Sequence, residues 1–193
     1  MPEYAEQDII KGCRKQDRAC QEYLYKKYYS LFLKICARYA KDMEDAEQLM
    51  NDGFLRIFTK IDSYENTGSF EGWMKRILVN TCLDYLRSSY LKTSMMMNFN
   101  INMVAEQAVS TRNEAITKME FRELLNHIQT LPTITKTVFN LFVFDGYTHA
   151  EIAKMLAISE GTSYWHVHQA RKLLQKKINS VDVNHKDYAS KRV

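Results

Sequence analysis

The stretch YTHAEIAKMLAISEGTSYWHVHQARKLL, residues 147–174, is typical of two helices joined by a tight turn. Thr148 and Glu151 have the spacing of a capping box, which begins a helix. The turn ends at Ser159, a residue type that caps a following helix well, here from about 160 to 178. The segment therefore predicts a helix-turn-helix, a unit whose second helix fits the major groove of DNA.

The second helix of this unit has an inward and an outward face. Val167, Ala170 and Leu174 recur at three- and four-residue spacing, so we expect them to point inward. His166 and Lys172 are expected nearer the edges of the groove-facing surface. The side chains that remain as candidates to contact DNA are Glu160, Thr162, Tyr164, Trp165, His168 and Arg171.

Composition favours an all-α protein of one or two small domains. Of the 193 residues, 46% are apolar, which is enough for hydrophobic cores, and 12 Tyr, 9 Phe and 2 Trp argue against disorder. Glycine and proline are scarce, at 6 and 2 residues. Helical spacing of apolar residues is frequent and strand-like alternation is hard to find, so the fold class is predicted to be all-α.

Charge is unevenly distributed along the chain. The formal net charge is +4. Residues 1–88 contain 14 basic and 14 acidic residues, whereas residues 120–193 contain 10 and 7. The helix-turn-helix lies in the positive part, a mild bias that is compatible with nucleic acid. The neutral first part is suited to a partner other than DNA.

The cysteines and the N-terminus indicate a cytoplasmic protein. Cys13, Cys20, Cys36 and Cys82 form no C-x-x-C pair, which favours reduced and mostly buried thiols. The N-terminal residues MPEYAEQD are acidic and polar, unlike a signal peptide, and no apolar run approaches membrane-spanning length.

The sequence shows no pattern of a catalytic or metal site. A phosphate-binding glycine loop, a nucleophile elbow and a Ser/His/Asp arrangement are all lacking. His166 and His168 stand two residues apart, so on a helix they point to different sides, and no cysteine or acid completes a zinc site. We therefore expect no enzymatic activity, cofactor, metal or small-molecule substrate.

Helical patterns divide the chain into two blocks joined by a linker. The first block, 1–88, contains expected helices near 6–13, 18–40, 44–61 and 70–87, with a loop at 66–69. The pattern fades over 89–113, which we interpret as the linker. The second block, 114–180, begins with a helix carrying Phe121, Leu124, Leu125 and Ile128, and Pro132 opens the next helix. Residues 181–193 are predicted to form a flexible polar tail.

Both blocks resemble a known family. The segments DAEQLMNDGFLRIF (45–58) and FEGWMKRILVNTCLDYLRS (70–88) are similar to region 2 of bacterial sigma factors, especially the small extracytoplasmic-function (ECF) type. The segment from 131 to 174 is similar to their region 4. The resemblance implies a factor that binds core RNA polymerase and directs promoter recognition and transcription initiation. It also implies that the linker threads through polymerase toward the active-site and RNA-exit region.

The resemblance implies a polymerase-docking face on the helix at 44–61. Asp45, Gln48 and Asp52 stand three and four residues apart, so they share one helix face, and Asn51 and Arg56 extend this polar surface. In the family this helix docks on the clamp helices of the largest polymerase subunit, and region 4 binds the flap. Gly53 departs from good helix sequence, because glycine is costly inside a helix.

The loop at 66–69 and the following helix correspond to the part of the family that melts and reads the −10 element. Opening a duplex needs groups that hold unstacked bases and single-stranded DNA. Phe70 and Trp73 are interpreted as core residues. The candidates for hydrogen bonds are Asn66, Ser69, Asn80 and Asp84, and those for phosphate contacts are Lys75, Arg76 and Arg87.

The helix from Glu160 corresponds to the reader of the −35 element, and here the sequence departs from the family. Relatives carry several basic residues where this chain has Ser163-Tyr164-Trp165-His166 and then Gln169. Fewer fixed charges imply weaker phosphate contact and less salt dependence. Tyr164 and Trp165 suit either thymine methyl groups or a protein-binding patch.

The family also implies a regulator, because such factors are often held inactive by an anti-sigma protein that is commonly membrane-anchored. Two other functions stay open from the residues. A conventional helix-turn-helix regulator with an N-terminal helical sensor domain would bind duplex DNA as a dimer without polymerase. A helical scaffold whose helix-turn-helix serves packing would lack salt-dependent DNA binding.

Overall fold

The computed structural model describes the backbone of residues 5–95 and 126–190, with side chains described for 5–88 and 126–177. The chain divides into two compact units, Met1–Ala105 and Glu106–Val193. Every regular element in the described ranges is helical, so the all-α prediction is confirmed. None of these helices combines the length and the apolar character that a bilayer-spanning segment requires.

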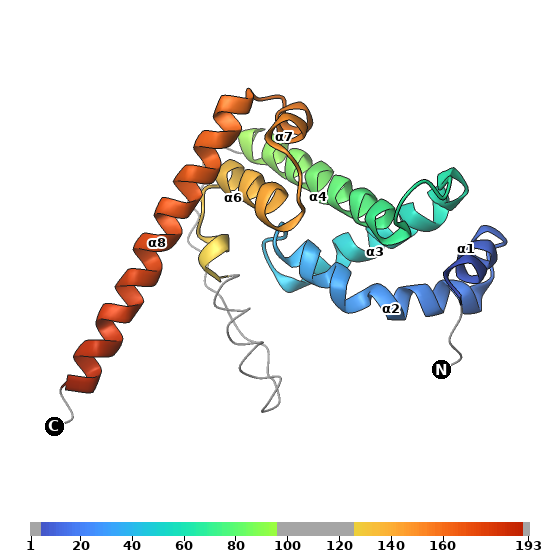
Figure 1. Ribbon diagram of the computed structural model, residues 1–193, viewed down its shortest axis with the longest axis horizontal. Helices are drawn as coiled ribbons and strands as arrows, with labels where there is room; N and C mark the ends of the chain where they lie inside the picture. The colour runs from blue at the N-terminus through green and yellow to red at the C-terminus, as the bar shows by residue number, and fades with distance from the viewer. Residues whose placement is uncertain (1–4, 96–125, 191–193) are drawn as a thin grey trace. The chain divides into compact units, whose positions relative to one another are not determined.

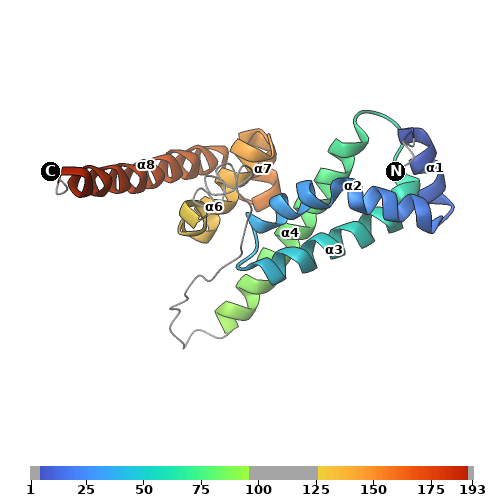
Figure 2. The same ribbon diagram turned by 90° about the horizontal axis from the view of Figure 1, so that it is seen from below.

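The first unit is a bundle in which three long helices pack against one another. It contains α1 (Glu6–Arg14), α2 (Arg18–Ala37), α3 (Met43–Lys60), the short 3₁₀ helix η1 (Ile61–Ser63) and α4 (Phe70–Met95). Figures 1 and 2 show α2, α3 and α4 side by side, with α1 packed on α2.

Side-chain caps fix where the long helices of this unit begin. Asp17 accepts hydrogen bonds from the amides of Ala19 and Cys20 and caps α2. Asp42 accepts from the amide of Asp45 at 2.8 Å and caps α3. The caps satisfy amides that the first helical turn leaves without intrahelical acceptors.

Close approach of α3 and α4 depends on Gly53. A Cβ atom at this position would lie 2.3 Å from Cδ1 of Leu78, a residue with no exposed surface. The glycine therefore trades helix propensity for tight packing. The surrounding core is built from large side chains, among them Ile9, Ile10, Leu24, Phe32, Met50, Ile57, Phe70, Met74 and Leu78.

The cysteines lie in this core. All four are buried free thiols, which confirms the prediction from their spacing. The sulfur atoms of Cys36 on α2 and Cys82 on α4 are 3.9 Å apart. Burial raises the pKa of the Cys13 thiol to about 12, so this thiol is protonated at neutral pH.

The second unit contains the helix-turn-helix. Its elements are α6 (Thr133–Phe139), a π-helical continuation η2 (Asn140–Phe144), α7 (His149–Leu156) and α8 (Glu160–Ser190). Both α6 and α7 pack on α8, whose first turns form the second helix of the predicted unit. The sequence placed Pro132 at the start of this helix; in the structure Pro132 is the N-cap residue and α6 begins one position later, at Thr133.

The turn between α7 and α8 forms as its sequence predicts. Thr148 and Glu151 complete a capping box at the start of α7. Ala157 adopts a left-handed backbone with φ 53° and ends that helix. The amide of Thr162 donates to Oγ of Ser159 at 3.0 Å, so Ser159 caps α8.

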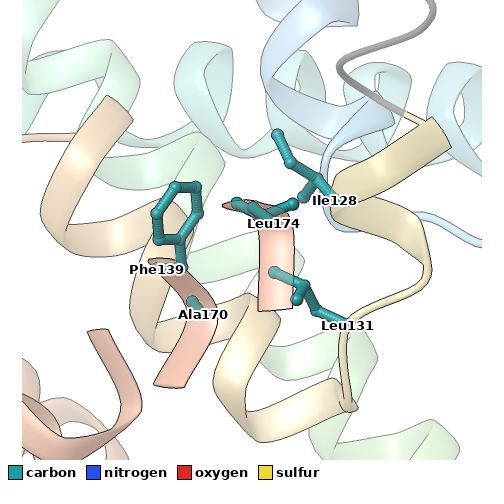
Figure 3. Close-up of a cluster of buried hydrophobic side chains, with 5 residues drawn as sticks. All are labelled: Ile128, Leu131, Phe139, Ala170 and Leu174. Atoms are coloured by element: carbon teal, nitrogen blue, oxygen red, sulfur yellow. The ribbon is translucent and has the colours of Figure 1, made fainter. Parts of the chain in front are cut away.

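A cluster of buried apolar side chains holds α8 against the elements before it (Figure 3). Ile128 and Leu131 come from the segment ahead of α6, Phe139 from the end of α6, and Ala170 and Leu174 from α8. Val167 is also buried, with 4% of its surface exposed. The predicted inward face of the second helix is therefore confirmed.

Two helices end later than the sequence suggested. The backbone of α4 continues to Met95 rather than ending near Arg87, and α8 continues to Ser190 rather than ending near Ile178. Neither extension contains glycine or proline, so nothing stops the backbone helix where the apolar pattern fades. The remaining linker residues, and Phe121, Leu124 and Leu125, lie outside the described residues.

Candidate functional site

A polar groove of about 480 Å³ runs between α3 and α4 in the first unit. Four of the five predicted docking residues line it, namely Asp45, Gln48, Asp52 and Arg56. The helix α4 contributes Thr81, Asp84, Tyr85 and Ser88 to the same groove. We call this surface the α3/α4 groove.

Asp45 is held in place at one end of the α3/α4 groove. The Tyr85 hydroxyl donates a hydrogen bond to Oδ2 of Asp45 at 2.6 Å, and Nζ of Lys41 lies 3.3 Å from the same oxygen. Burial, and then the hydrogen bond to this carboxylate, raise the pKa of Tyr85 above its usual range. Tyr85 therefore stays a hydrogen-bond donor at physiological pH.

Asp84 joins residues that the sequence assigned to different functions. Its carboxylate pairs with Arg56 across the two helices at 2.7 Å and with Arg87 on its own helix at 3.2 Å. Arg56 was a candidate for docking, whereas Asp84 and Arg87 were candidates for the −10 element. Arg56 and Asp84 line the α3/α4 groove, and Arg87 is joined to them through its pair with Asp84.

Asn51 lies apart from the other docking candidates. Its Oδ1 accepts a hydrogen bond from the Tyr25 hydroxyl of α2 at 3.0 Å. Leu55, by contrast, is 66% exposed and follows Gln48 and Asp52 at helical spacing. The sequence analysis did not include Leu55 because it considered only polar residues for this face. The three-residue spacing from Asp52 to Leu55 already places this leucine beside them.

The loop before α4 is built on an aromatic cluster. The Tyr64 hydroxyl donates to the carbonyl of Gly68 at 2.7 Å, and the Tyr64 ring lies 5.0 Å from that of Phe70 and 5.4 Å from that of Trp73. Phe70 is fully buried as expected, whereas Trp73 is half-buried. Asn66 has a left-handed backbone with φ 57°, so its exposed side chain sits on a constrained turn.

The −10 candidates on α4 divide between two sides of the helix. Arg76, Asn80 and Asp84 are exposed and stand four residues apart, so they share one face. Lys75 lies on another side and pairs with Glu71 at 2.5 Å.

Ser69, another −10 candidate, is exposed and has a structural task. Its Oγ accepts the Gly72 amide at 3.2 Å at the start of α4. The hydroxyl therefore caps the helix, and its proton remains available to a further acceptor.

The groove-facing candidates of α8 are exposed except for Thr162. Tyr164 and Trp165 expose 60% and 57% of their surfaces, and Glu160, His168 and Arg171 are exposed as well. Thr162 is half-buried, and its Oγ1 shares a hydrogen bond with Oγ of the cap residue Ser159 at 2.8 Å.

His166 was expected near the edge of the DNA-facing surface, and this prediction is wrong. The side chain is 8% exposed, and its Nδ1 shares a hydrogen bond with Oγ1 of Thr135 at 3.0 Å. His168 is exposed on another side of the helix. Within the described residues, no group of three His, Cys, Asp or Glu side chains could hold a metal ion.

Comparison with protein families identifies both units. The family profile of Sigma-70 region 2 matches residues 24–90, and that of Sigma-70 region 4 matches residues 121–174. Together they span more than half of the chain, in the order expected from the sequence. The first match contains the α3/α4 groove and the loop before α4, and the second contains the helix-turn-helix.

Similar proteins of nearly the same length are sigma factors. The ECF RNA polymerase sigma factor SigW of Bacillus subtilis (strain 168) is 24% identical over 179 residues, which are 89% of this chain and 96% of SigW. The ECF RNA polymerase sigma-E factor of Haemophilus influenzae is 21% identical over 180 residues, covering 90% and 95%.

Solved structures share the fold. CnrH, in complex with the cytosolic domain of CnrY, has a TM-score of 0.53 at 16% identity and covers 92% of this chain and 99% of its own. The sigma factor RpoE of Bartonella quintana, in complex with the anti-sigma factor NepR, has a TM-score of 0.58 at 17% identity, covering 82% and 96%. The chain therefore belongs to the sigma-70 family, as a non-enzymatic RNA polymerase sigma factor of the ECF type that directs promoter recognition and transcription initiation.

Proposed function

We propose that this sigma factor docks on core RNA polymerase through the α3/α4 groove and the exposed surface of α3 beside it. The observation that carries the proposal is the convergence of Asp45, Gln48, Asp52 and Arg56 on one open surface. Leu55 adds an exposed apolar side chain next to these polar groups. Such a mixture suits a protein partner, because an apolar centre supplies affinity and a polar rim supplies orientation.

This surface binds the clamp helices of the largest polymerase subunit, and region 4 binds the flap. Within the α3/α4 groove, the Arg56–Asp84 pair ties the docking helix α3 to the helix α4 that follows the −10 loop. The polymerase-facing surface of α3 and the helix α4 therefore lie next to each other.

Promoter recognition is divided between the two units. The loop at 66–69, with the exposed α4 face that carries Arg76 and Asn80, holds the opened −10 element. The first turns of α8 read the −35 element in the major groove. Each contact is weak alone, and joining both units on one polymerase raises the effective concentration of the second contact.

In this proposal the factor acts in the cytoplasm and is regulated by an anti-sigma protein. Such regulators are commonly membrane-anchored in this family. Support comes from two similar folds solved in complexes, CnrH with the cytosolic domain of CnrY and RpoE with the anti-sigma factor NepR. A covering partner would compete for the same exposed surfaces that polymerase and DNA use.

The test compares wild type with the variant Asp45→Ala/Gln48→Ala/Asp52→Ala for co-elution with bacterial core RNA polymerase. The matched control is Glu22→Ala/Lys26→Ala, which removes an exposed ion pair of α2 away from the α3/α4 groove. We expect the triple variant to lose at least tenfold in affinity and the control to bind as wild type does. Equal binding of the triple variant would refute the docking face. No binding of wild type to core, with dimeric binding to duplex DNA, would favour a conventional regulator.

A further inference from the structure

Two large aromatic side chains project from the first turns of α8. Tyr164 is 60% exposed and Trp165 is 57% exposed. Exposing two adjacent aromatic rings to water is unfavourable, because most of their surface is apolar. An exposed apolar patch of this kind marks a site of contact with a partner. Their place on the second helix of a helix-turn-helix puts this apolar surface where such helices contact base edges.

Each ring is backed by a buried histidine. The Tyr164 ring stacks on that of His149 with 3.7 Å between centroids, and the His149 ring stacks in turn on that of Phe142 at 4.2 Å. Trp165 meets the ring of His166 edge-on at 4.9 Å.

Hydroxyl groups of other residues fix both histidines. Nδ1 of His149 shares a hydrogen bond with Oγ of Ser163 at 2.8 Å, and Nδ1 of His166 shares one with Oγ1 of Thr135 at 3.0 Å. The aromatic pair therefore rests on a buried, hydrogen-bonded support. A rigid ring loses little conformational entropy on binding, so this support favours recognition by the rings.

Charge along α8 is segregated from the aromatic pair. The exposed cations Arg171, Lys172 and Lys176 lie on the later turns, whereas the first turn carries Glu160. Cations on the later turns suit phosphate oxygens, which position a protein on DNA without reading its sequence. Sequence discrimination is then left to Tyr164 and Trp165 on the first turns of α8. The apolar group that a base pair presents in the major groove is the C5-methyl of thymine.

We propose that Tyr164 and Trp165 read thymine methyl groups in the −35 element, while Arg171 and Lys172 hold the flanking phosphates. This specificity rests on the proposed function, in which α8 enters the major groove. His149 acts as a positioning residue for Tyr164. DNA is favoured over a protein partner because the cations continue the same exposed helix beyond the aromatic pair.

The experiment begins by selecting promoters with holoenzyme reconstituted from core polymerase and the full-length chain, from a library with a randomised −35 region. Thymines in the selected −35 element are then replaced singly by deoxyuridine, which removes only the methyl group. At a contacted thymine we expect about fourfold weaker binding, the value of one buried methyl-sized group. Tyr164→Ala and Trp165→Ala should each abolish the deoxyuridine effect at one position.

Matched variants separate a contact with DNA from a general loss of folding. Tyr164→Phe retains the ring and should keep the deoxyuridine effect, and His149→Ala should weaken it without removing Tyr164. Val143→Ala changes another exposed apolar residue of the same unit and should behave as wild type.

The outcomes also separate this inference from the proposed function. One outcome is a holoenzyme that selects a −35 sequence whose binding does not change when thymine is replaced by deoxyuridine. Another is a deoxyuridine effect in Tyr164→Ala and Trp165→Ala that equals the effect in wild type. Either result overturns the thymine readout and leaves the sigma function standing. Aromatic variants that initiate normally but lose binding to an anti-sigma protein would assign the pair to a protein contact and overturn the inference. No binding to core and no selection would refute the proposed function itself.

Discussion

The Tyr85 hydroxyl of α4 donates a hydrogen bond of 2.6 Å to the Asp45 carboxylate of α3. This contact joins the first turn of the proposed docking helix to the middle of the next long helix. It fixes the direction of a carboxylate that lies at the edge of the α3/α4 groove, where its side chain is 20% exposed. The orientation of Asp45 toward a partner is therefore set by a residue 40 positions later in the chain.

Tyr85→Phe should lower stability and weaken polymerase docking. Loss of the hydroxyl leaves Asp45 without this donor, so we expect a loss of about 1 kcal/mol in the free energy of unfolding, measured in urea. Burial raises the pKa of Tyr85, so the unfolded state ionises first above about pH 10, and wild-type stability falls there. The variant should show less of this alkaline decline. An unchanged decline would mean that other tyrosines dominate it.

Gly53→Ala should destabilise the first unit although alanine favours helix. The new Cβ would lie 2.3 Å from Cδ1 of the buried Leu78, and the resulting overpacking costs about 1–3 kcal/mol. The free energy of unfolding of Gly53→Ala, of its control and of wild type is measured in urea. The control is Gly72→Ala, where the Cβ would meet Ser69 at an ordinary 3.6 Å and stability should rise by about 0.5–1 kcal/mol. Equal stabilisation by both alanines would show that α3 and α4 can separate at low cost.

His166→Asn should flatten the acid dependence of stability of the second unit. Burial lowers the pKa of His166. The free energy of unfolding is therefore not reduced by this histidine at pH values above its ordinary pKa of about 6.5. As pH falls below that value, the unfolded state binds the proton first and stability is lost. Asparagine retains a polar group near Thr135 without titrating in this range.

The measurement for His166→Asn is urea unfolding at a series of pH values between 7.5 and 5.5. His168→Asn removes an exposed histidine of the same helix and leaves the contact with Thr135 intact. A steep acid decline that persists in His166→Asn and disappears in His168→Asn would contradict the assignment.

Arg76→Ala/Asn80→Ala should impair promoter opening more than Lys75→Ala does. Arg76 and Asn80 share the exposed face of α4, whereas Lys75 is paired with Glu71 on another side. Loss of a charge-assisted contact with single-stranded DNA should weaken holoenzyme binding to an opened −10 fragment by about tenfold. Permanganate reactivity of the −10 thymines reports the opening. A larger defect in Lys75→Ala would place the DNA on the other side of α4.

Local pattern determined much of this protein from the sequence alone. The capping box of Thr148 and Glu151, the cap at Ser159 and the inward spacing of Val167 and Ala170 are properties of neighbouring residues. Hydrogen bonds and side-chain directions within a helix depend on residues up to four positions apart, so they can be read from spacing. The all-α class and the family resemblance follow from the same local signals.

Tertiary structure decided which distant residues share a surface. Asp84 meets Arg56 across 28 positions, Asn51 turns to Tyr25 and away from the α3/α4 groove, and His166 becomes a buried support. These outcomes depend on how closely α3 and α4 approach and on how α6 packs against α8. Helix packing follows from the fit of whole side-chain surfaces, a property that the spacing within any single helix does not contain.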